Sequence, residues 1–256
     1  MSSPSIHDAS PSQGVVDIAR GAGLAEAWER AVLLAWQHGF DFVQEDTGDS
    51  YRGRPMVLEL PEPLGEPRYH RMILALPSDI ESYIQEVVAG SKDHLIDLAD
   101  PNKWHYTYHE RLTRYDLPGG ETIHQIDKLL AHLAQSPNSR RAQAITWKPW
   151  MDPEEKDPPC LQRLWCIVQN GRLNMHTHWR SREALLASFM NILALTTWQE
   201  MFAKRLGVEM GYYLEFTDNF HIYQRDYPRA EMLTEKFLTA PPEARFLSAE
   251  LYRSLV

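Results

Sequence analysis

The pattern of apolar and polar residues along the chain predicts both helices and strands. Apolar side chains recur at helical spacing in segments 23–39, 79–89, 122–134 and 184–195. The second of these segments follows Ser78, a good N-cap residue, and stops at Gly90. Strands are predicted over residues 56–60, 142–147, 161–169, 172–179 and 212–223. A polar loop is expected over residues 46–54, before the first of these strands.

Two segments indicate how these elements are arranged. The dipeptide Asn170-Gly171 predicts a type I′ turn that joins strands 161–169 and 172–179 in a hairpin. Segment 184–195 is apolar almost all round, so its helix must be buried on all sides. We expect an α/β (α+β) fold in which a central mixed β-sheet packs on this buried helix, with further helices flanking it.

Composition limits the domain count and the class of partner. The chain has 256 residues, 43% hydrophobic and 24% charged, which is ordinary for a protein with a substantial core. No repeat divides it, so residues 15–256 are expected to form a single domain after a disordered, Ser/Pro-rich lead-in over residues 1–14. The net charge of -9 argues against a nucleic-acid partner, although a few arginines suffice for a small phosphate ligand.

The cysteines and the N-terminus predict a cytoplasmic protein. Cys160 and Cys166 cannot form the disulfide framework of a secreted domain. The N-terminal residues lack the pattern of a signal peptide, and no apolar run is long enough for a membrane span, so no membrane partner is expected.

Four features suggest chemistry rather than structure alone. They are the adjacent pair Arg140-Arg141, Cys160 after two prolines, Arg180-Ser181 at a strand end, and Asn191 inside the apolar helix. Each also has a structural explanation: an arginine pair is often solvated, a lone cysteine is often a small core residue, and a buried asparagine can cap a backbone group. His176 and His178 alternate along a strand, but no further ligand stands at useful spacing, so no metal is expected.

Together these features resemble the thymidylate synthase family, and in particular its compact archaeal branch. The motifs that carry the resemblance are R-R-x5-W (residues 140–147), P-C-L-Q (159–162), W-R-S-x-E (179–183) and H-I-Y (221–223). The intervals that separate Arg141, Cys160, Arg180, Asn191 and His221 match the family pattern. The segment Y-T-Y-H-E-R-L (106–112) resembles the family's Tyr-Gly segment and aligns Tyr108 with its active-site tyrosine.

This resemblance implies an enzyme in which Cys160 adds to C6 of a pyrimidine nucleoside 5′-monophosphate. A one-carbon unit from 5,10-methylenetetrahydrofolate, the cosubstrate, is then transferred to C5. Arg180 would lower the pKa of the thiol. Methylation of dUMP to dTMP is expected first; the alternative is a hydroxymethylase acting on CMP, dCMP or dUMP, in which water replaces hydride. A nucleotide-binding protein without turnover and a cysteine hydrolase are the other classes considered.

The resemblance also assigns roles in nucleotide binding. Arg180, Ser181 and an N-terminal-loop arginine would hold the phosphate, with Arg140 and Arg141 supplied by the other subunit of a homodimer. Arg52 is preferred for the loop arginine, with Arg54 as the alternative. His221 and Tyr223, two residues apart on a strand, would bind the sugar, and Asn191 would read the base edge.

The resemblance assigns the folate contacts and the catalytic glutamate less directly, because this sequence has different residues from the family at some of these positions. Glu183 stands where the family has a folate-contacting aspartate, and Trp147 and Val256 are further expected cofactor contacts. Alignment on Gly90 puts Tyr83 at the position of the family's catalytic glutamate, with Glu81 and Glu86 on the same predicted helix. Glu81, which is nearer the apolar stripe, is preferred.

Overall fold

A computed structural model describes residues 14–255. The expected lead-in therefore lies outside the described residues except for Gly14, and so does Val256. The main sheet consists of β1 (Asp17–Arg20), β2 (Phe40–Val43), β3 (Ser50–Leu60), β7 (Gln143–Ile145), β8 (Leu161–Gln169), β9 (Arg172–Trp179), β10 (Arg182–Glu183) and β11 (Glu209–Tyr223). Smaller pairs are formed by β4 (Tyr69–His70) with β12 (Phe246–Leu247), and by β5 (Tyr115–Asp116) with β6 (Thr122–Ile123).

The main sheet is mixed, as predicted. Its order is β1-β3-β11-β9-β8-β7, with β2 added to β3 and β10 to β11. Strand β11 is parallel to β9 but antiparallel to β3, while β8 and β9 form an antiparallel hairpin. The α/β (α+β) fold class is confirmed.

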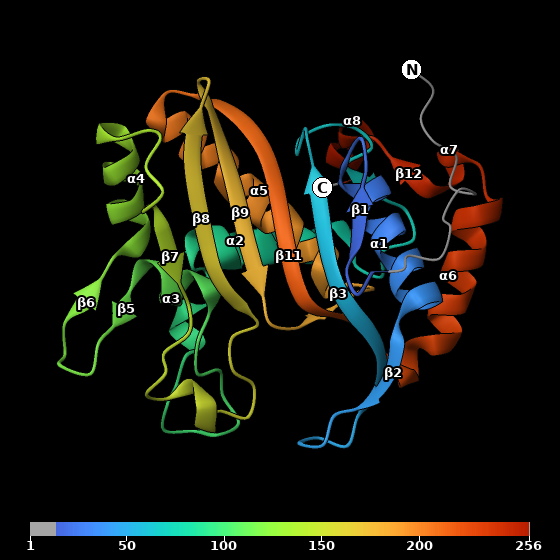
Figure 1. The fold of residues 1–256 in the computed structure, drawn as a ribbon, viewed down its shortest axis with the longest axis horizontal. Helices are drawn as coiled ribbons and strands as arrows, with labels where there is room; N and C mark the ends of the chain where they lie inside the picture. Colours follow the sequence, from blue (N-terminus) through green and yellow to red (C-terminus); the bar gives the residue numbers. More distant parts are fainter. Residues whose placement is uncertain (1–13, 256) are drawn as a thin grey trace.

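Helices cover one face of this sheet. They are α1 (Leu24–His38), α2 (Pro77–Ala89), α3 (Tyr108–Thr113), α4 (Gln125–Gln135), α5 (Ala187–Leu206), α6 (Tyr227–Thr239), α7 (Pro242–Arg245) and α8 (Ala249–Arg253). Figure 1 shows α2 and α5 behind β8, β9 and β11, whose near face carries no helix. Among residues 14–255, no helix is long and apolar enough to span a membrane.

Helix α5 is the buried helix expected from its all-round apolar sequence. Phe189, Ile192 and Leu193 have no exposed surface. The helix starts later and ends later than predicted, because residues 184–186 form its N-terminal approach and Gly207 closes it in the left-handed region (φ 69°). Its burial therefore follows from the sequence, whereas its ends depend on local hydrogen bonds.

Three other predicted boundaries were wrong for local reasons. Half of the expected 46–54 loop belongs to β3, because residues 51–54 pair with β11. Helix α2 begins at Pro77 rather than after Ser78, since the Asp79 carboxylate accepts the Leu76 backbone N–H at 3.1 Å. Helix α4 begins at Gln125 because the preceding residues pair in β6.

The β8–β9 hairpin positions the most informative residues. Asn170 and Gly171 both adopt positive φ angles (52° and 74°), as the predicted turn requires. At the open end of the hairpin, the Arg180 backbone N–H donates to the Cys160 carbonyl at 2.9 Å. The strand register therefore brings Cys160 and Arg180 side by side.

Candidate active site

The prolines before Cys160 bind the Arg180 side chain. Its guanidinium donates from Nε to the Pro159 carbonyl at 3.1 Å and from Nη2 to the Pro158 carbonyl at 2.6 Å. The P-P-C segment is thus held around the cation, which lies next to the thiol.

The Cys160 thiol experiences two opposing influences. Burial raises the pKa of Cys160 and is the largest cause, while Arg180 and then Arg182 lower it. The predicted effect of the Arg180 guanidinium is therefore present, but burial outweighs it in the free protein. Cys166 is fully buried among apolar residues, and both cysteines are free thiols.

Arg182 is a charged group that the sequence analysis did not single out. It is 2% exposed, pairs with Glu215 at 2.8 Å, and donates to the Ser188 carbonyl. Its guanidinium also lies 3.7 Å from the centre of the Trp179 ring. The only sequence signal was its place in the W-R-S-R-E motif. Its guanidinium lowers the pKa of Cys160 against the larger effect of burial, although less than Arg180 does.

Three half-buried tyrosines, Tyr83, Tyr106 and Tyr108, gather around Cys160. Burial is the largest cause that raises the pKa of each, and the thiol adds to each shift. Tyr108 is also hydrogen-bonded by the Leu161 backbone, beside the thiol. The three hydroxyls therefore stay protonated near neutral pH and can donate hydrogen bonds. Tyr108 was anticipated, whereas Tyr106 was missed although it stands in the same motif.

A residue of helix α2 forms a hydrogen bond with the Asn191 side chain. The residue is 7% exposed, and its Oδ1 accepts a hydrogen bond from the Tyr83 hydroxyl. Tyr83 was considered only as the residue that occupies the expected position of a glutamate. The contact is long-range and could not be found from spacing along the chain.

His221 and Tyr223 lie close to the Arg180-Ser181 segment, because β10, which follows it directly, pairs with β11. Strand β10 pairs Glu183 with His221, and the rings of His221 and Tyr223 are 4.7 Å apart. Burial lowers the pKa of His221, and Arg225 and Arg180 lower it further. Arg225, another residue missed from the sequence, lies over the Tyr223 ring at 4.0 Å.

The two candidate loop arginines are engaged elsewhere. Arg52 binds Asp41 at 2.8 Å and lies over the Trp36 ring. Arg54 is 4% exposed and pairs with Asp17 at 3.0 Å. Both guanidinium groups are therefore tied to the N-terminal part of the sheet.

Arg140 and Arg141 lie at the start of the edge strand β7 and are exposed. Within residues 14–255, neither guanidinium is in an ion pair. Trp165 donates to the Arg140 carbonyl at 3.0 Å, which fixes the backbone and leaves both side chains directed outward. They do not join Cys160 within one subunit by any contact in the described chain.

The glutamates of α2 have different surroundings. Glu81 accepts a hydrogen bond from the Tyr252 hydroxyl at 3.3 Å, on the side of α8. Glu86 pairs with Lys92 at 2.8 Å and lines a cavity together with Tyr106 and Tyr108. Of the two, Glu86 is the one that shares a cavity with Tyr106 and Tyr108.

Comparison with known proteins identifies the family of the chain. The family model described as thymidylate synthase matches residues 82–251. The chain belongs to the thymidylate synthase family. It is 36% identical over 181 residues to a protein named "Putative thymidylate synthase" from Methanocaldococcus jannaschii, covering 68% of this chain and 72% of that protein. A protein of the same name from Methanopyrus kandleri is 31% identical over 212 residues, covering 82% and 95% of the two chains.

The family uses a folate cosubstrate, and a cavity with aromatic side chains in its lining lies beside Tyr106 and Tyr108. The cavity beside Tyr106 and Tyr108 has a volume of about 260 Å³. Its other walls include Glu86, Trp104, His105, Glu155 and Asp157. Aromatic side chains with a few hydrogen-bonding groups are a suitable lining for a heterocycle.

The cofactor residues expected from the sequence lie in separate places. The Glu183 carboxylate caps α5 by accepting backbone N–H groups of residues 185–187 at 2.5–2.9 Å. Trp147 is half-buried, and its carbonyl accepts the Tyr115 hydroxyl at 2.6 Å. The third, Val256, is outside the described residues.

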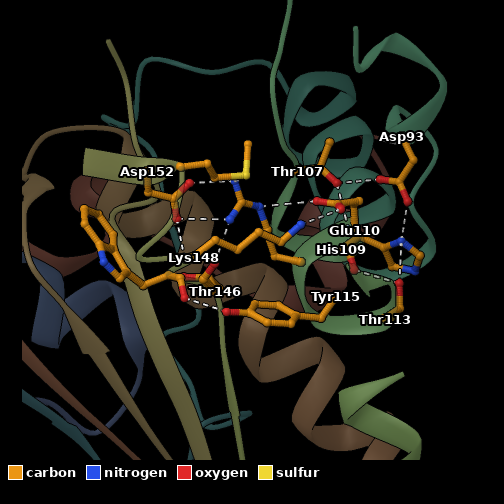
Figure 2. A network of polar contacts seen from close by, with 12 residues as sticks. Asp93, Thr107, His109, Glu110, Thr113, Tyr115, Thr146, Lys148 and Asp152 are labelled. Carbon is orange, nitrogen blue, oxygen red and sulfur yellow. Dashed lines mark hydrogen bonds and ion pairs between the residues drawn. The ribbon is translucent and has the colours of Figure 1, made fainter. Parts of the chain in front are cut away.

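A buried polar network fixes the tyrosine segment to the loop before β8, as Figure 2 shows. Arg111 on α3 binds both oxygens of Asp152, at 2.8 and 3.0 Å, and its guanidinium also lies 5.4 Å from the Tyr106 ring centre. Lys148 lies 3.4 Å from Glu110. Bidentate pairing restricts rotation as well as separation, so this network stabilises the positions of Tyr106 and Tyr108.

Proposed function

We propose that this chain transfers a one-carbon unit from methylenetetrahydrofolate to C5 of a pyrimidine nucleoside 5′-monophosphate. The observation that carries the proposal is the pairing of Cys160 with Arg180 at the open end of the β8–β9 hairpin. It puts a thiol beside a cation able to bind phosphate. Family membership supports a transferase of this type.

The proposed nucleophile is Cys160. Its thiolate forms a bond from Sγ to C6 of the base, and the electron pair of the C5–C6 double bond moves to C5. Arg180 and Arg182 favour the thiolate, because both lower the pKa of Cys160 against the effect of burial. The folate supplies the one-carbon unit that C5 accepts.

Once the one-carbon unit is on C5, its bond to the folate nitrogen would break, hydride from the released tetrahydrofolate or water would add to the exocyclic methylene, and expulsion of the Cys160 thiolate would restore the C5–C6 double bond. Breaking the folate bond first requires a base that takes the C5 proton. We propose Tyr108, with Tyr106, as the hydroxyl group that relays this proton, and Glu86 as the carboxylate that accepts it. Glu86 replaces Glu81 in this role because it lines the cavity with both tyrosines. A positioned acid–base group typically contributes about 10²–10⁴-fold in rate.

The phosphate would be held by Arg180 and Ser181, with Arg225 as a further cation. Arg225 replaces the loop arginine in this proposal, because Arg52 and Arg54 are held by Asp41 and Asp17 at 2.8 and 3.0 Å, whereas the ion pairs of Arg225 with Asp49 and Asp226 are longer, at 3.7 Å each. The Arg225 side chain is 63% exposed and influences His221 together with Arg180. His221 and Tyr223 would bind the sugar between these two cations.

A homodimer would supply Arg140 and Arg141 to the partner's site. Two observations support this: the guanidinium groups are exposed without ion pairs in residues 14–255, and one sheet face lacks a helical cover (Figure 1). On that face Trp165, His176 and Tyr212 form an aromatic cluster, with ring centres 4.7 and 5.5 Å apart. Such a face is suited to burial against a second copy.

Complementation tests the shared site. Arg141→Ala and Cys160→Ala proteins should each be inactive, and mixing them with subunit exchange should restore about a quarter of wild-type activity, since half of the dimers then contain one complete site. Arg205→Ala, in place of Arg141→Ala, is the control for loss of an exposed arginine and should be active without mixing. Proven exchange without recovery would contradict a site completed by the partner.

Two nucleotide classes fit the proposed chemistry. The names of the relatives suggest methylation of dUMP to dTMP, and hydroxymethylation of CMP, dCMP or dUMP is the alternative, with water in place of hydride. Mass spectrometry of products from dUMP, UMP, dCMP and CMP with methylenetetrahydrofolate would distinguish them. No product and no Cys160 adduct from any of the four would refute the proposal.

A further inference from the structure

Arg182 and Trp179, two buried residues of the W-R-S-x-E motif, pack directly on each other. The Arg182 guanidinium lies 3.7 Å from the centre of the Trp179 ring, and the two residues are 2% and 1% exposed. A planar guanidinium is suited to stacking on an aromatic face. Strand register pairs Trp179 with Leu161, the residue that follows Cys160. The stacked pair is therefore next to the nucleophile segment.

A closed set of hydrogen bonds fixes this stacked pair. One oxygen of the Glu215 carboxylate accepts Arg182 Nη1 at 2.8 Å and the Tyr213 hydroxyl at 2.9 Å. The Tyr213 and Thr177 hydroxyls are 2.8 Å apart, and the Trp179 indole N–H donates to Thr177 at 3.2 Å. All five side chains are buried. Because the contacts return to Trp179, neither the guanidinium nor the indole ring turns without breaking a buried hydrogen bond.

The position of Arg182 is unfavourable for its own hydrogen bonding. Nη2 donates to the Ser188 carbonyl at 2.8 Å, but Nε is buried without a hydrogen-bond partner among residues 14–255. A buried donor without an acceptor destabilises a fold, and a buried ion pair is often no more stabilising than apolar residues of similar volume. Stability alone is therefore a weak reason for the Arg182–Glu215 pair, whereas orientation of a neighbouring group accounts for it.

The neighbouring group is Tyr108. Its ring centre lies 5.6 Å from that of Trp179, and the ring planes meet at 86°, which is the T-shaped arrangement that aromatic pairs prefer. Tyr108 also lines the cavity that contains Glu86. A tilt of the indole ring would therefore move the Tyr108 hydroxyl relative to the Glu86 carboxylate.

We infer that Arg182 is a positioning residue for the proton step: it supports Trp179, and Trp179 holds the Tyr108 ring in the direction from which its hydroxyl relays the C5 proton. This inference rests on the proposed function. The role depends on the planar shape of the guanidinium, whereas the effect of Arg182 on the Cys160 thiol depends on its charge. A substitution that keeps the charge separates the two.

Arg182→Lys is that substitution, because an ammonium group keeps the charge but has no plane to lay on the indole ring. Release of tritium from C5-labelled CMP, dCMP, UMP or dUMP with methylenetetrahydrofolate measures proton loss. Covalent trapping by the matching 5-fluoro analogue stops before that step, since fluorine replaces the C5 proton. Arg182→Lys should lower kcat for tritium release about tenfold and leave the trapping rate within about twofold of wild type.

A double variant shows whether the effect passes through Tyr108. Tyr108→Phe keeps the ring and lacks the hydroxyl, so adding Arg182→Lys to it should cause no further loss of kcat. Independent defects multiply instead. A further loss of about tenfold in the double variant would overturn the inference, because Arg182 would then act on another step.

Arg245→Lys is the matched control. Arg245 is also buried, pairs with Glu29 and lies 4.7 Å from the Phe246 ring centre, outside the candidate site. Its replacement should leave kcat within about twofold of wild type. Thr177→Val removes the acceptor of the Trp179 N–H and is measured alongside, with melting temperatures of all variants. It should lower kcat about threefold with unchanged trapping, and it decides the matter if Arg182→Lys does not fold.

The outcomes separate this inference from the proposed function. An unchanged kcat in folded Arg182→Lys, or in Thr177→Val if the first variant does not fold, would overturn the inference. An equal loss of trapping and tritium release would also overturn it, since the defect would then lie at the thiol. Absence of turnover and of a covalent adduct in the wild-type protein with all four nucleotides would instead refute the proposed function, and the inference with it.

Discussion

The β8–β9 hairpin and helix α2 both contribute residues around Cys160, but they do so by different means. In the hairpin, backbone pairing brings Cys160 and Arg180 together, and the turn at Asn170-Gly171 sets the register. On α2, Tyr83 and Glu86 reach the site through side chains whose direction depends on how the helix packs against α5 and α3.

This difference explains which residues of the candidate site could be predicted from the sequence. Backbone register is regular, so residues at fixed sequence intervals meet across a hairpin. Helix rotation is set by the whole apolar face, and one helical step moves a side chain by about 100° around the axis. Glu81 and Glu86 therefore point to different neighbours although both are close to Tyr83 in sequence.

The largest expected effect removes the nucleophile of the hairpin. Cys160→Ala should lower turnover by at least about 10³-fold, because no other group can form the bond to C6. It should also abolish covalent trapping by 5-fluoro analogues of CMP and dUMP, as measured by intact-protein mass spectrometry. Cys166→Ala is the matched control: Cys166 is fully buried, so this variant should lose some stability and keep both trapping and turnover. Loss of trapping in folded Cys166→Ala would contradict the assignment.

An intermediate effect separates the two α2 glutamates. Glu86→Gln should lower kcat by about 10²-fold, because the amide cannot accept the C5 proton. Glu81→Gln keeps an oxygen for the Tyr252 hydroxyl and should stay within about threefold of wild type. Steady-state kinetics with the preferred nucleotide measures both. A larger loss in Glu81→Gln would restore Glu81 as the catalytic carboxylate.

The smallest expected effect concerns how the positive charge of Arg180 changes the pKa of the Cys160 thiol. Burial raises the pKa of Cys160, so alkylation of the free protein by iodoacetamide should be slow at neutral pH and accelerate as pH rises through that raised pKa. Arg180→Ala removes a cation that lowers the pKa, so its profile should move to higher pH and its rate at pH 8 should fall by up to about tenfold. Arg180→Lys keeps a charge and should move less. A shift of the Arg180→Ala profile to lower pH would contradict the inference that Arg180 lowers the pKa of Cys160.

Much of the fold could be predicted from local patterns. The all-round apolar sequence of α5 required burial, and the amphipathic pattern of α1 gave a helix with correct ends within two residues. The predicted boundaries were wrong where a segment pairs with a strand that is distant in sequence. Residues of the expected loop 46–54 became part of β3 because β11 offered them hydrogen-bonding partners. The polar side chains in this segment gave no sign of that partner.

The residues of the candidate site also form two groups, those that could be predicted from the sequence and those that could not. The resemblance to the family implied that Cys160, Arg180 and the His221–Tyr223 pair belong to one site, and they lie on or next to the paired strands β8, β9, β10 and β11. Arg182 was missed, and Tyr83 was considered only at the position of a glutamate, because their importance depends on contacts with Glu215 and Asn191, which lie far away in sequence. No interval along the chain encodes such contacts.

The sequence by itself determined the family, the mixed α/β architecture and the residues carried by paired strands, since strand pairing converts sequence intervals directly into spatial neighbours. Only the tertiary structure decided which glutamate of α2 lines the cavity, that burial outweighs Arg180 at the thiol, and that Tyr83 forms a hydrogen bond with Asn191. These depend on helix rotation, desolvation and side-chain direction, and each is set by the packing of the whole domain rather than by the residues nearest in the chain.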